Sequence, residues 1–345
     1  MSTLFSLSQL GWQNFYQQQL SLDEWDGFIA TRVVAQHRNC LEVIGESGRR
    51  TVEINSALEA LTVGDWVLMD HNDRPIRLLD RRSLFSRKSV GSKLGTQLVA
   101  ANVDTVFIVC SLNHDFNLNR IERYLALAKE ADVEAVVVLS KADLCDEPET
   151  FTQAVQKLDP LLIVEAVNIL DIDSSQGLKA WCTKGKTVAF MGSSGVGKST
   201  LVNALLGEAA QVTQDVREDD SKGRHTTTGR SLHLMPTGGW LMDTPGMREL
   251  QLANCESGVT AAFQDIAELA QACQFGDCQH MEEPGCAVKQ AIEDDNLDQR
   301  RLKNFHKLLR EQAFNGASLA EKRAKFRQLG RHIRSAQKVK NKRTH

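Results

Sequence analysis

The chain has 345 residues, of which 42% are hydrophobic and 25% are charged, with only 6 prolines and 23 glycines. This composition is typical of a globular protein and excludes a collagen-like, low-complexity or wholly disordered chain. At about 100–200 residues per domain, the length predicts two or three domains, each with a core of its own.

The net charge of −3 conceals an acidic body and a basic tail. Residues 300–345 carry 15 lysines and arginines against 2 carboxylates, a balance of +13, which leaves −16 for residues 1–299. Such a tail favours a polyanionic partner, because lysine and arginine displace counterions from phosphates. A solvated helix surface explains the same charge equally well.

The longest apolar runs, at residues 103–110 and 135–139, have strand length and fall short of the roughly 20 residues that a membrane helix needs. The first residues show no basic leader followed by an apolar core, so we expect a cytoplasmic protein without membrane association. We also expect a monomer. The scattered cysteines Cys40, Cys110, Cys145, Cys182 and Cys255 are typical of reduced thiols rather than of a disulfide framework.

In chain order, residues 1–25 are rich in glutamine and weakly patterned, which suggests a flexible N-terminal arm. Over residues 26–82, short runs of Val, Ile and Leu alternate with turn residues and predict a small β-barrel. OB-like and SH3-like barrels share this pattern, so composition does not choose between them.

From residue 103 onward, buried-strand runs alternate with amphipathic helical patterns, which predicts a mainly parallel α/β sheet covered on both faces. This unit is expected over residues 83–257, and residues 81–101, which span its start, are a basic connector. Residues 258–345 are helix-prone around a cysteine cluster and predict a third domain.

Residues 192–199, GSSGVGKS, match the phosphate-binding pattern G-x-x-x-x-G-K-[ST] between an apolar strand and a helical pattern. Backbone N–H groups and the helix start would surround phosphate oxygens there. Lys198 is predicted to bridge the β- and γ-phosphates, and Ser199 to ligate Mg²⁺. The predicted nucleotide-binding residues of this segment are Gly192, Ser193, Ser194, Gly195, Val196, Gly197, Lys198, Ser199 and Thr200.

Two downstream segments complete the expected phosphate site. Residues 240–246, WLMDTPG, place Asp243 and Gly246 after an apolar strand, where the aspartate can hold magnesium through water and the glycine N–H can contact the γ-phosphate. The polar stretch 211–230 contains GRHTTTG, in which a threonine could complete the magnesium shell. We interpret both segments as nucleotide-dependent switches.

The predicted base-reading element is Ser140, Lys141, Ala142 and Asp143, after the apolar strand at 135–139. The Asp143 carboxylate can accept from guanine N1–H and from the exocyclic amino group, a pair that adenine does not supply. Ser140 stands where the N-K-x-D pattern has asparagine, so that contact is expected to be weakened or replaced. This element precedes the phosphate loop, whereas it follows it in Ras-like GTPases, so the order is circularly permuted.

Met247 follows the Asp-Thr-Pro-Gly segment, where Ras-type enzymes have a water-orienting glutamine. An apolar side chain cannot orient water, so we expect slow hydrolysis in the free protein. His225 is the candidate catalytic residue, because a neutral imidazole can accept from water. A histidine bonded within its own loop, or touching RNA, is the alternative.

Cys273, Cys278, His280 and Cys286 offer three thiolates and one imidazole within a short segment. This Cys₃His set predicts one structural zinc ion with no open coordination position.

Together, the permuted order, the GSSGVGKS, GRHTTTGR and DTPGMREL segments and the cysteine cluster resemble the ribosome small-subunit-dependent GTPase A family, also called RsgA or YjeQ. The resemblance implies an OB fold at 26–82, a permuted GTPase domain at 83–257 and a zinc-binding helical domain with a basic tail at 258–345. It also implies a GTP hydrolase that acts in late maturation of the 30S subunit, binds 16S rRNA and is stimulated by the subunit.

Two other functions remain open on the residues alone. A P-loop ATPase or small-molecule kinase would prefer ATP to GTP, which tests Asp143 directly. A noncatalytic RNA-binding scaffold would fail to hydrolyse GTP even with purified 30S subunits.

Overall fold

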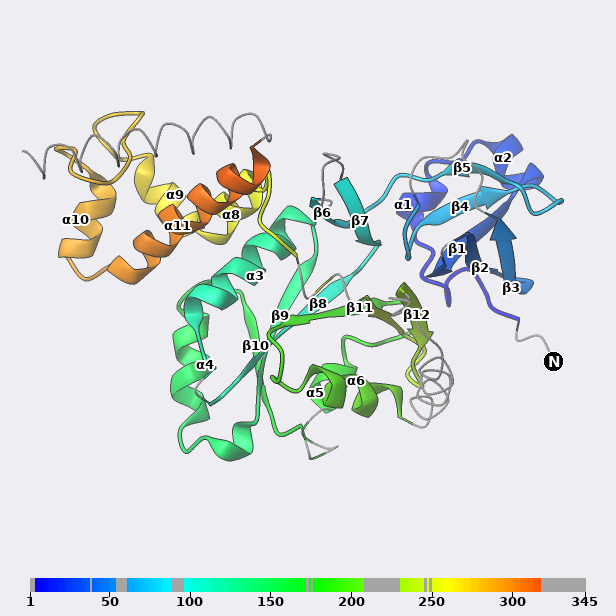
Figure 1. Cartoon of the computed structure of the whole chain (residues 1–345), viewed down its shortest axis with the longest axis horizontal. Coiled ribbons are helices and arrows are strands. Elements are labelled where there is room, and N and C mark those ends of the chain that lie inside the picture. Colours follow the sequence, from blue (N-terminus) through cyan, green and yellow to red (C-terminus); the bar gives the residue numbers. More distant parts are fainter. Residues whose placement is uncertain are drawn as a thin grey trace, which may run out of the picture.

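The computed structural model describes residues 4–37, 39–53, 61–88, 96–113, 115–169, 171, 174, 176–207, 230–244, 247 and 250–317. Three parts succeed one another along the molecule: an N-terminal β unit, a central α/β unit and a C-terminal helical unit (Figure 1). His225, Gly246, the first predicted switch up to residue 229 and the basic tail beyond residue 317 lie outside the described residues.

The N-terminal β unit pairs its strands antiparallel in the order β3-β2-β1-β4-β5. Val33, Val43 and Val67 belong to a small buried cluster of this unit, whereas Ile44 and Trp66 join the main core. Alternate burial of this kind is what a strand period of two residues produces. The strands are β1 (Ile29–Gln36), β2 (Cys40–Gly45), β3 (Gly48–Glu53), β4 (Trp66–Met69) and β5 (Pro75–Leu78).

Residues 4–27 do not form the flexible arm that the sequence suggested. They contain α1 (Asn14–Gln17) and α2 (Leu22–Gly27), and the side chains of Leu10 and Tyr16 are buried. The Leu10 carbonyl accepts a hydrogen bond of 2.7 Å from the buried guanidinium of Arg32. The segment is therefore fixed against the β unit by contacts far along the chain, which its own weak pattern does not reveal.

The central sheet has the strand order β10-β9-β8-β11-β13-β12, in which only β12 is antiparallel to its neighbour β13. Val106 and Ile108 of β8 face one core cluster and Phe107 and Val109 face another. A strand buried on both faces explains the uninterrupted apolar run. The strands are β8 (Thr105–Ser111), β9 (Glu134–Ser140), β10 (Ile163–Val167), β11 (Thr187–Gly192), β12 (Arg230–Leu234) and β13 (Trp240–Asp243).

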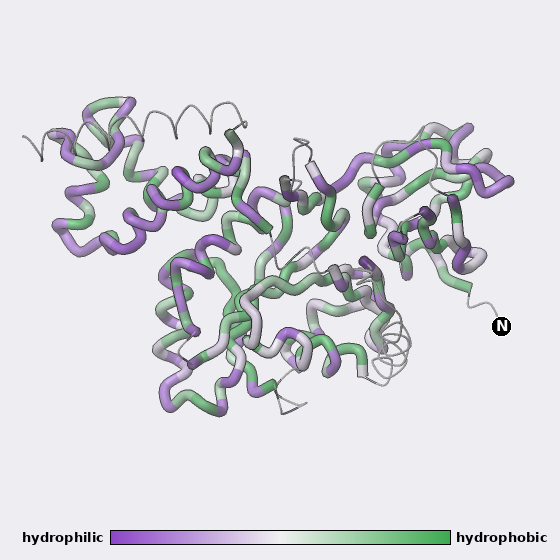
Figure 2. The backbone as a smooth tube through the Cα atoms, in the orientation of Figure 1, coloured by the Kyte–Doolittle hydropathy of each residue, from purple (hydrophilic) through white to green (hydrophobic). Residues whose placement is uncertain are grey.

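Helices cover both faces of this sheet, with α3 and α4 on one side and α5 and α6 on the other (Figure 1). The central strands are coloured mostly as hydrophobic in Figure 2. This arrangement confirms the predicted α/β unit. The helices are α3 (Leu118–Glu130), α4 (Pro148–Gln156), α5 (Gln176–Lys179) and α6 (Lys198–Leu206), and the 3-10 helix η1 (Ala142–Leu144) follows β9.

The β unit and the α/β unit share one continuous sheet. β1 pairs antiparallel with β12, through Ala35 opposite Ser231 and Gln36 opposite Arg230. The connector forms a separate hairpin of β6 (Leu84–Lys88) and β7 (Thr96–Ala101). The proposed boundary at residues 82 and 83 thus lies just before this hairpin.

The C-terminal unit contains α8 (Glu256–Ala262), α9 (Gln264–Ala270), α10 (Ala287–Glu293) and α11 (Gln299–Gly316). α8 packs closely on α3, since a Cβ at Gly258 would lie 2.4 Å from the carbonyl oxygen of Ala126. Glycine is required at this crossing because any side chain would force the two helices apart. Among the described helices, none is both long and apolar enough to cross a membrane.

Candidate nucleotide-binding site and metal cluster

The predicted phosphate loop lies where β11 ends and α6 begins. Gly192 closes the strand with φ 142°, and a Cβ there would lie 2.4 Å from the carbonyl oxygen of Val109 on the neighbouring strand β8. Gly197 adopts a left-handed φ of 94° immediately before α6 starts at Lys198. Both glycines are needed for the chain to turn tightly between a buried strand and a helix.

Lys198 points back into this loop. The residue is only 7% exposed, and its ammonium group donates to the carbonyl oxygen of Gly192 at 2.7 Å and to that of Ser193. The loop therefore holds a buried cation beside its first two residues. Ser199 and Thr200 occupy the first turn of α6, and both are exposed.

The base-reading segment touches the same loop, although it lies some 50 residues upstream. At the end of β9, the buried Ser140 hydroxyl donates to the carbonyl oxygen of Val196 at 2.6 Å. The Lys141 ammonium donates to the carbonyl oxygen of Gly195 at 3.0 Å. Asp143 follows in η1 with an exposed side chain. The permuted chain thus brings the two predicted elements together.

Asp243 is at the same edge of the sheet. It is the last residue of β13, which runs parallel to β11 with Met242 opposite Ala189. The next residue, Thr244, is 5% exposed, and its hydroxyl has no hydrogen-bond partner among the described residues. The Asp243 carboxylate therefore lies at the strand edge where the phosphate loop begins, and carboxylate oxygens are among the ligands that Mg²⁺ prefers.

Two residues of this region were missed by sequence reasoning. Arg120, in the first turn of α3, donates from Nη1 to the Ser193 hydroxyl at 2.6 Å. The same nitrogen donates to Asp115 Oδ1 at 2.6 Å, in the loop between β8 and α3. No motif marks either residue. The only sequence signal is that both follow the end of a buried strand, the edge at which α/β sheets bind ligands.

The cysteine cluster assembles as predicted in the loop between α9 and α10. The ligand atoms of Cys273, Cys278, His280 and Cys286 all lie within 4.8 Å of one another. The Cys273 and Cys286 sulfurs are 3.9 Å apart, and His280 Nδ1 is 3.6 Å and 3.5 Å from them. A tetrahedral ion with sulfur at about 2.3 Å and nitrogen at about 2.0 Å requires separations of roughly 3.8 Å and 3.6 Å. The side chains thus fit one tetrahedral ion.

The protonation of the imidazole also suits a metal ligand. Burial, and then the nearby His306, lower the pKa of His280 below its ordinary value. A lowered pKa keeps the ring neutral at physiological pH, and neutral imidazole is the form that binds metals.

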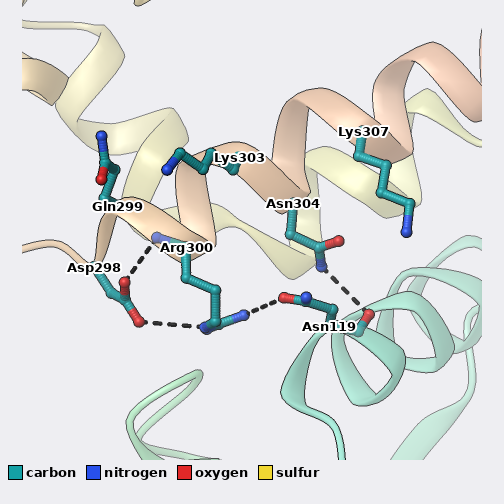
Figure 3. Close-up of a pocket in the computed structure, with 7 residues that line it drawn as sticks. All are labelled: Asn119, Asp298, Gln299, Arg300, Lys303, Asn304 and Lys307. Atoms are coloured by element: carbon teal, nitrogen blue, oxygen red, sulfur yellow. Dashed lines mark hydrogen bonds and ion pairs between the residues drawn. The ribbon is translucent and has the colours of Figure 1, made fainter.

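A cleft of about 510 Å³ opens between α3 and α11 (Figure 3). Arg300 donates to Asn119 across the cleft at 2.6 Å and is held by Asp298 at its own helix start. Lys303 and Lys307 lie one helical turn apart on α11, and both are exposed. The residues that line the cleft therefore bring positive charge and amide groups to it. Its lining residues are Asn119, Asp298, Gln299, Arg300, Lys303, Asn304 and Lys307.

Residues 78–253 match the model of a family described as RsgA GTPase. Over 343 residues the chain is 61% identical to small ribosomal subunit biogenesis GTPase RsgA 2 of Vibrio parahaemolyticus, covering 99% of this chain and 96% of that protein. It is 45% identical over 318 residues to small ribosomal subunit biogenesis GTPase RsgA of Mesorhizobium japonicum, covering 90% and 91%.

Solved structures show the same fold. The crystal structure of YjeQ from Thermotoga maritima superimposes with a TM-score of 0.64 at 26% identity, over 83% of this chain and 98% of that one. YloQ, described as a circularly permuted GTPase, gives a TM-score of 0.59 at 23% identity, over 82% and 94%. The predicted fold class is confirmed.

Proposed function

The chain belongs to the RsgA GTPase family, and from this premise we propose that it hydrolyses GTP to GDP and phosphate during late maturation of the 30S ribosomal subunit. The relatives named above are small ribosomal subunit biogenesis GTPases. A cytoplasmic location fits this role, and we propose that the protein acts as a monomer.

The observation that carries the proposal is the pair of hydrogen bonds from Ser140 and Lys141 to the phosphate loop. They hold the strand end that leads to Asp143 against the loop that would cradle the phosphates. A base and its phosphates belong to one ligand, so their predicted contacts must meet in one place. The Asp143 carboxylate recognises guanine and rejects adenine, because adenine does not supply the matching pair of hydrogen-bond donors.

The residues of the phosphate site are proposed to have two roles, binding of the phosphates and binding of Mg²⁺. The N–H groups of residues 192–200 and the Lys198 ammonium would hold phosphate oxygens. Ser199 and Asp243 would hold Mg²⁺, with Gly246, outside the described residues, near the γ-phosphate. When bound, the ion supplies charge neutralisation between the phosphates. The buried Thr244 hydroxyl beside Asp243 supports a polar ligand at this edge.

Hydrolysis in the free protein is proposed to be slow. Met247 is 2% exposed and apolar, so the residue after Asp-Thr-Pro-Gly cannot orient a water molecule. His225 remains the candidate for that role and lies outside the described residues. We propose that contact with the subunit positions it, and that this is how the subunit stimulates turnover.

The metal in the C-terminal unit is proposed to be one structural zinc ion. Three thiolates and a neutral imidazole at tetrahedral separations favour zinc over harder cations. Four protein ligands leave no position for a substrate, so the ion would stabilise the loop between α9 and α10.

We propose that the partner of the cleft between α3 and α11 is the 16S rRNA. Lys303 and Lys307 line the cleft beside α3, and the sequence after residue 317, outside the described residues, is rich in lysine and arginine. Positive charge in this density suits a phosphate backbone.

The test is GTP turnover by the full-length protein, with and without purified 30S subunits and with ATP as competitor. We expect low basal turnover, strong stimulation by 30S and no competition by ATP. Turnover that ATP suppresses would indicate an ATPase. Absence of hydrolysis with 30S would indicate a noncatalytic scaffold.

A further inference from the structure

Two cations converge on one residue of the phosphate loop. The Lys198 ammonium donates to the carbonyl oxygen of Ser193, and Arg120 Nη1 donates to the hydroxyl of the same residue at 2.6 Å. Lys198 belongs to the loop motif, whereas Arg120 comes from a helix about 70 residues upstream. The predicted phosphate site therefore has a positive charge that its motif does not account for.

The topology of the sheet explains how Arg120 reaches the loop. β8 runs parallel to β11, with Val109 opposite Gly192, so both strands end at the same edge. The chain leaves β8, turns, and starts α3 at the N-cap Asn117, whose side chain accepts from the Arg120 backbone N–H. The first turn of α3 is thereby fixed next to the phosphate loop.

Asp115 holds the Arg120 guanidinium in this position and leaves it accessible to a ligand. Its Oδ1 accepts from Arg120 at 2.6 Å, and this hydrogen bond raises the pKa of Arg120, so the group stays charged. Both side chains remain about one third exposed. A guanidinium has five N–H donors, and the contacts with Asp115 and Ser193 both use a single nitrogen, Nη1.

Binding of a nucleoside triphosphate requires a positively charged group near its terminal phosphate. GTP differs from GDP by the γ-phosphate, whose charge must be compensated for tight binding and for hydrolysis. The residue after Asp-Thr-Pro-Gly is the buried, apolar Met247 and offers no donor. In some GTPases an arginine supplied within the same chain compensates this charge, and its planar fork matches phosphate oxygens.

We propose that Arg120 is a nucleotide-binding residue that recognises the γ-phosphate of GTP, with Asp115 as the residue that positions it. The proposal rests on the proposed GTPase function and extends it to a specific contact. Arg120 would then distinguish GTP from GDP, because only GTP carries the phosphate group that its guanidinium contacts.

The test compares a non-hydrolysable GTP analogue with GDP in equilibrium titrations of the full-length protein. Arg120→Ala should weaken the GTP analogue by about 10-fold or more, as expected for a lost charged hydrogen bond, and leave GDP within about twofold. Arg120→Lys, which keeps a point charge but not the fork, should recover part of the difference. Arg123→Ala is the matched control, since Arg123 lies on the same helix but pairs with Glu311.

Ser193→Ala separates recognition from mere support of the loop. It removes the contact through which Arg120 holds the loop and keeps the cation. We expect it to preserve the ratio of GTP to GDP affinity. If Ser193→Ala instead reproduces Arg120→Ala, or if Arg120→Ala weakens both nucleotides equally or neither, the proposal is overturned. Should Arg120→Ala fail to fold, Arg120→Lys and Ser193→Ala decide the question. Failure of the unaltered protein to bind either nucleotide would instead refute the proposed function.

Discussion

Ser140 shows how one substitution in a motif is accommodated at the scale of a residue. Its side chain is fully buried and donates to the carbonyl oxygen of Val196 in the phosphate loop at 2.6 Å. The sequence predicted that the usual asparagine contact is weakened or replaced. It could not predict this bond, because a hydrogen bond between residues 56 positions apart depends on strand packing. The serine hydroxyl ties the base-reading strand to the loop.

Removing this hydroxyl tests its importance. Ser140→Ala leaves the buried Val196 carbonyl without its partner, which costs about 1–3 kcal/mol. We expect guanine nucleotides to bind about 10-fold more weakly in a fluorescence titration. Ser257→Ala is the control, since that hydroxyl bonds Glu130 far from the loop. Equal affinity of the two variants would show that Ser140 does not support the site.

At the scale of an element, α3 connects the phosphate loop to the C-terminal unit. Arg120 on its first turn contacts Ser193, and Glu122, two residues later, is fully buried against α11. The Glu122 carboxylate accepts from Arg300 and Arg301 at 3.0 Å and from Asn304 at 2.5 Å. Amphipathic periodicity predicted α3. It could not explain the charged Glu122 on the buried face of this helix, because its partners, Arg300 and Arg301, belong to α11.

Glu122→Gln should therefore be strongly destabilising. Loss of one partner from a buried ion pair is strongly destabilising. Here Arg300 and Arg301 would both lose their shared buried carboxylate and keep only the more exposed Asp298 and Asp265. We expect a loss of about 3 kcal/mol in the free energy of unfolding, measured in urea. Glu311→Gln breaks the partly exposed pair with Arg123 and should cost less than about 1 kcal/mol. Similar losses in the two variants would contradict a special role for Glu122.

The metal cluster is an element of its own, with no regular helix or strand between residues 271 and 286. Its ligand spacing was sufficient to predict it, because four ligands in a short segment leave few other functions. Chelation should increase protease cleavage in this loop, since the apo loop has lost the bonds that order it. GDP affinity should stay within about twofold, because the nucleotide site lies in another unit. Loss of GDP binding on chelation would mean that the two units fold together.

At the scale of the whole molecule, the strands of the N-terminal β unit and of the GTPase unit form one continuous sheet, joined by the pairing of β1 with β12. Composition and motifs predicted each unit, but the pairing of Gln36 with Arg230 joins edges that lie far apart in sequence. The packed residues 4–27 escaped prediction for the same reason. Arg230 also donates to the Leu98 carbonyl on β7, so the last residue of the predicted first switch is held by two other parts of the chain.

This junction offers a route by which nucleotide state alters docking on the 30S subunit. A change in the first switch would act on Arg230 and through it on the β unit. We expect at least about 10-fold tighter 30S binding with a non-hydrolysable GTP analogue than with GDP, measured by co-sedimentation, because a ligand shifts a conformation only through differential affinity. Arg230→Ala removes the bonds to Leu98 and Gln36 and should reduce this ratio while leaving GTP affinity unchanged. Arg49→Ala, at an exposed pair on β3, is the control. An equal 30S affinity with both nucleotides in the unaltered protein would refute this coupling, because the bound nucleotide would then have no effect on docking.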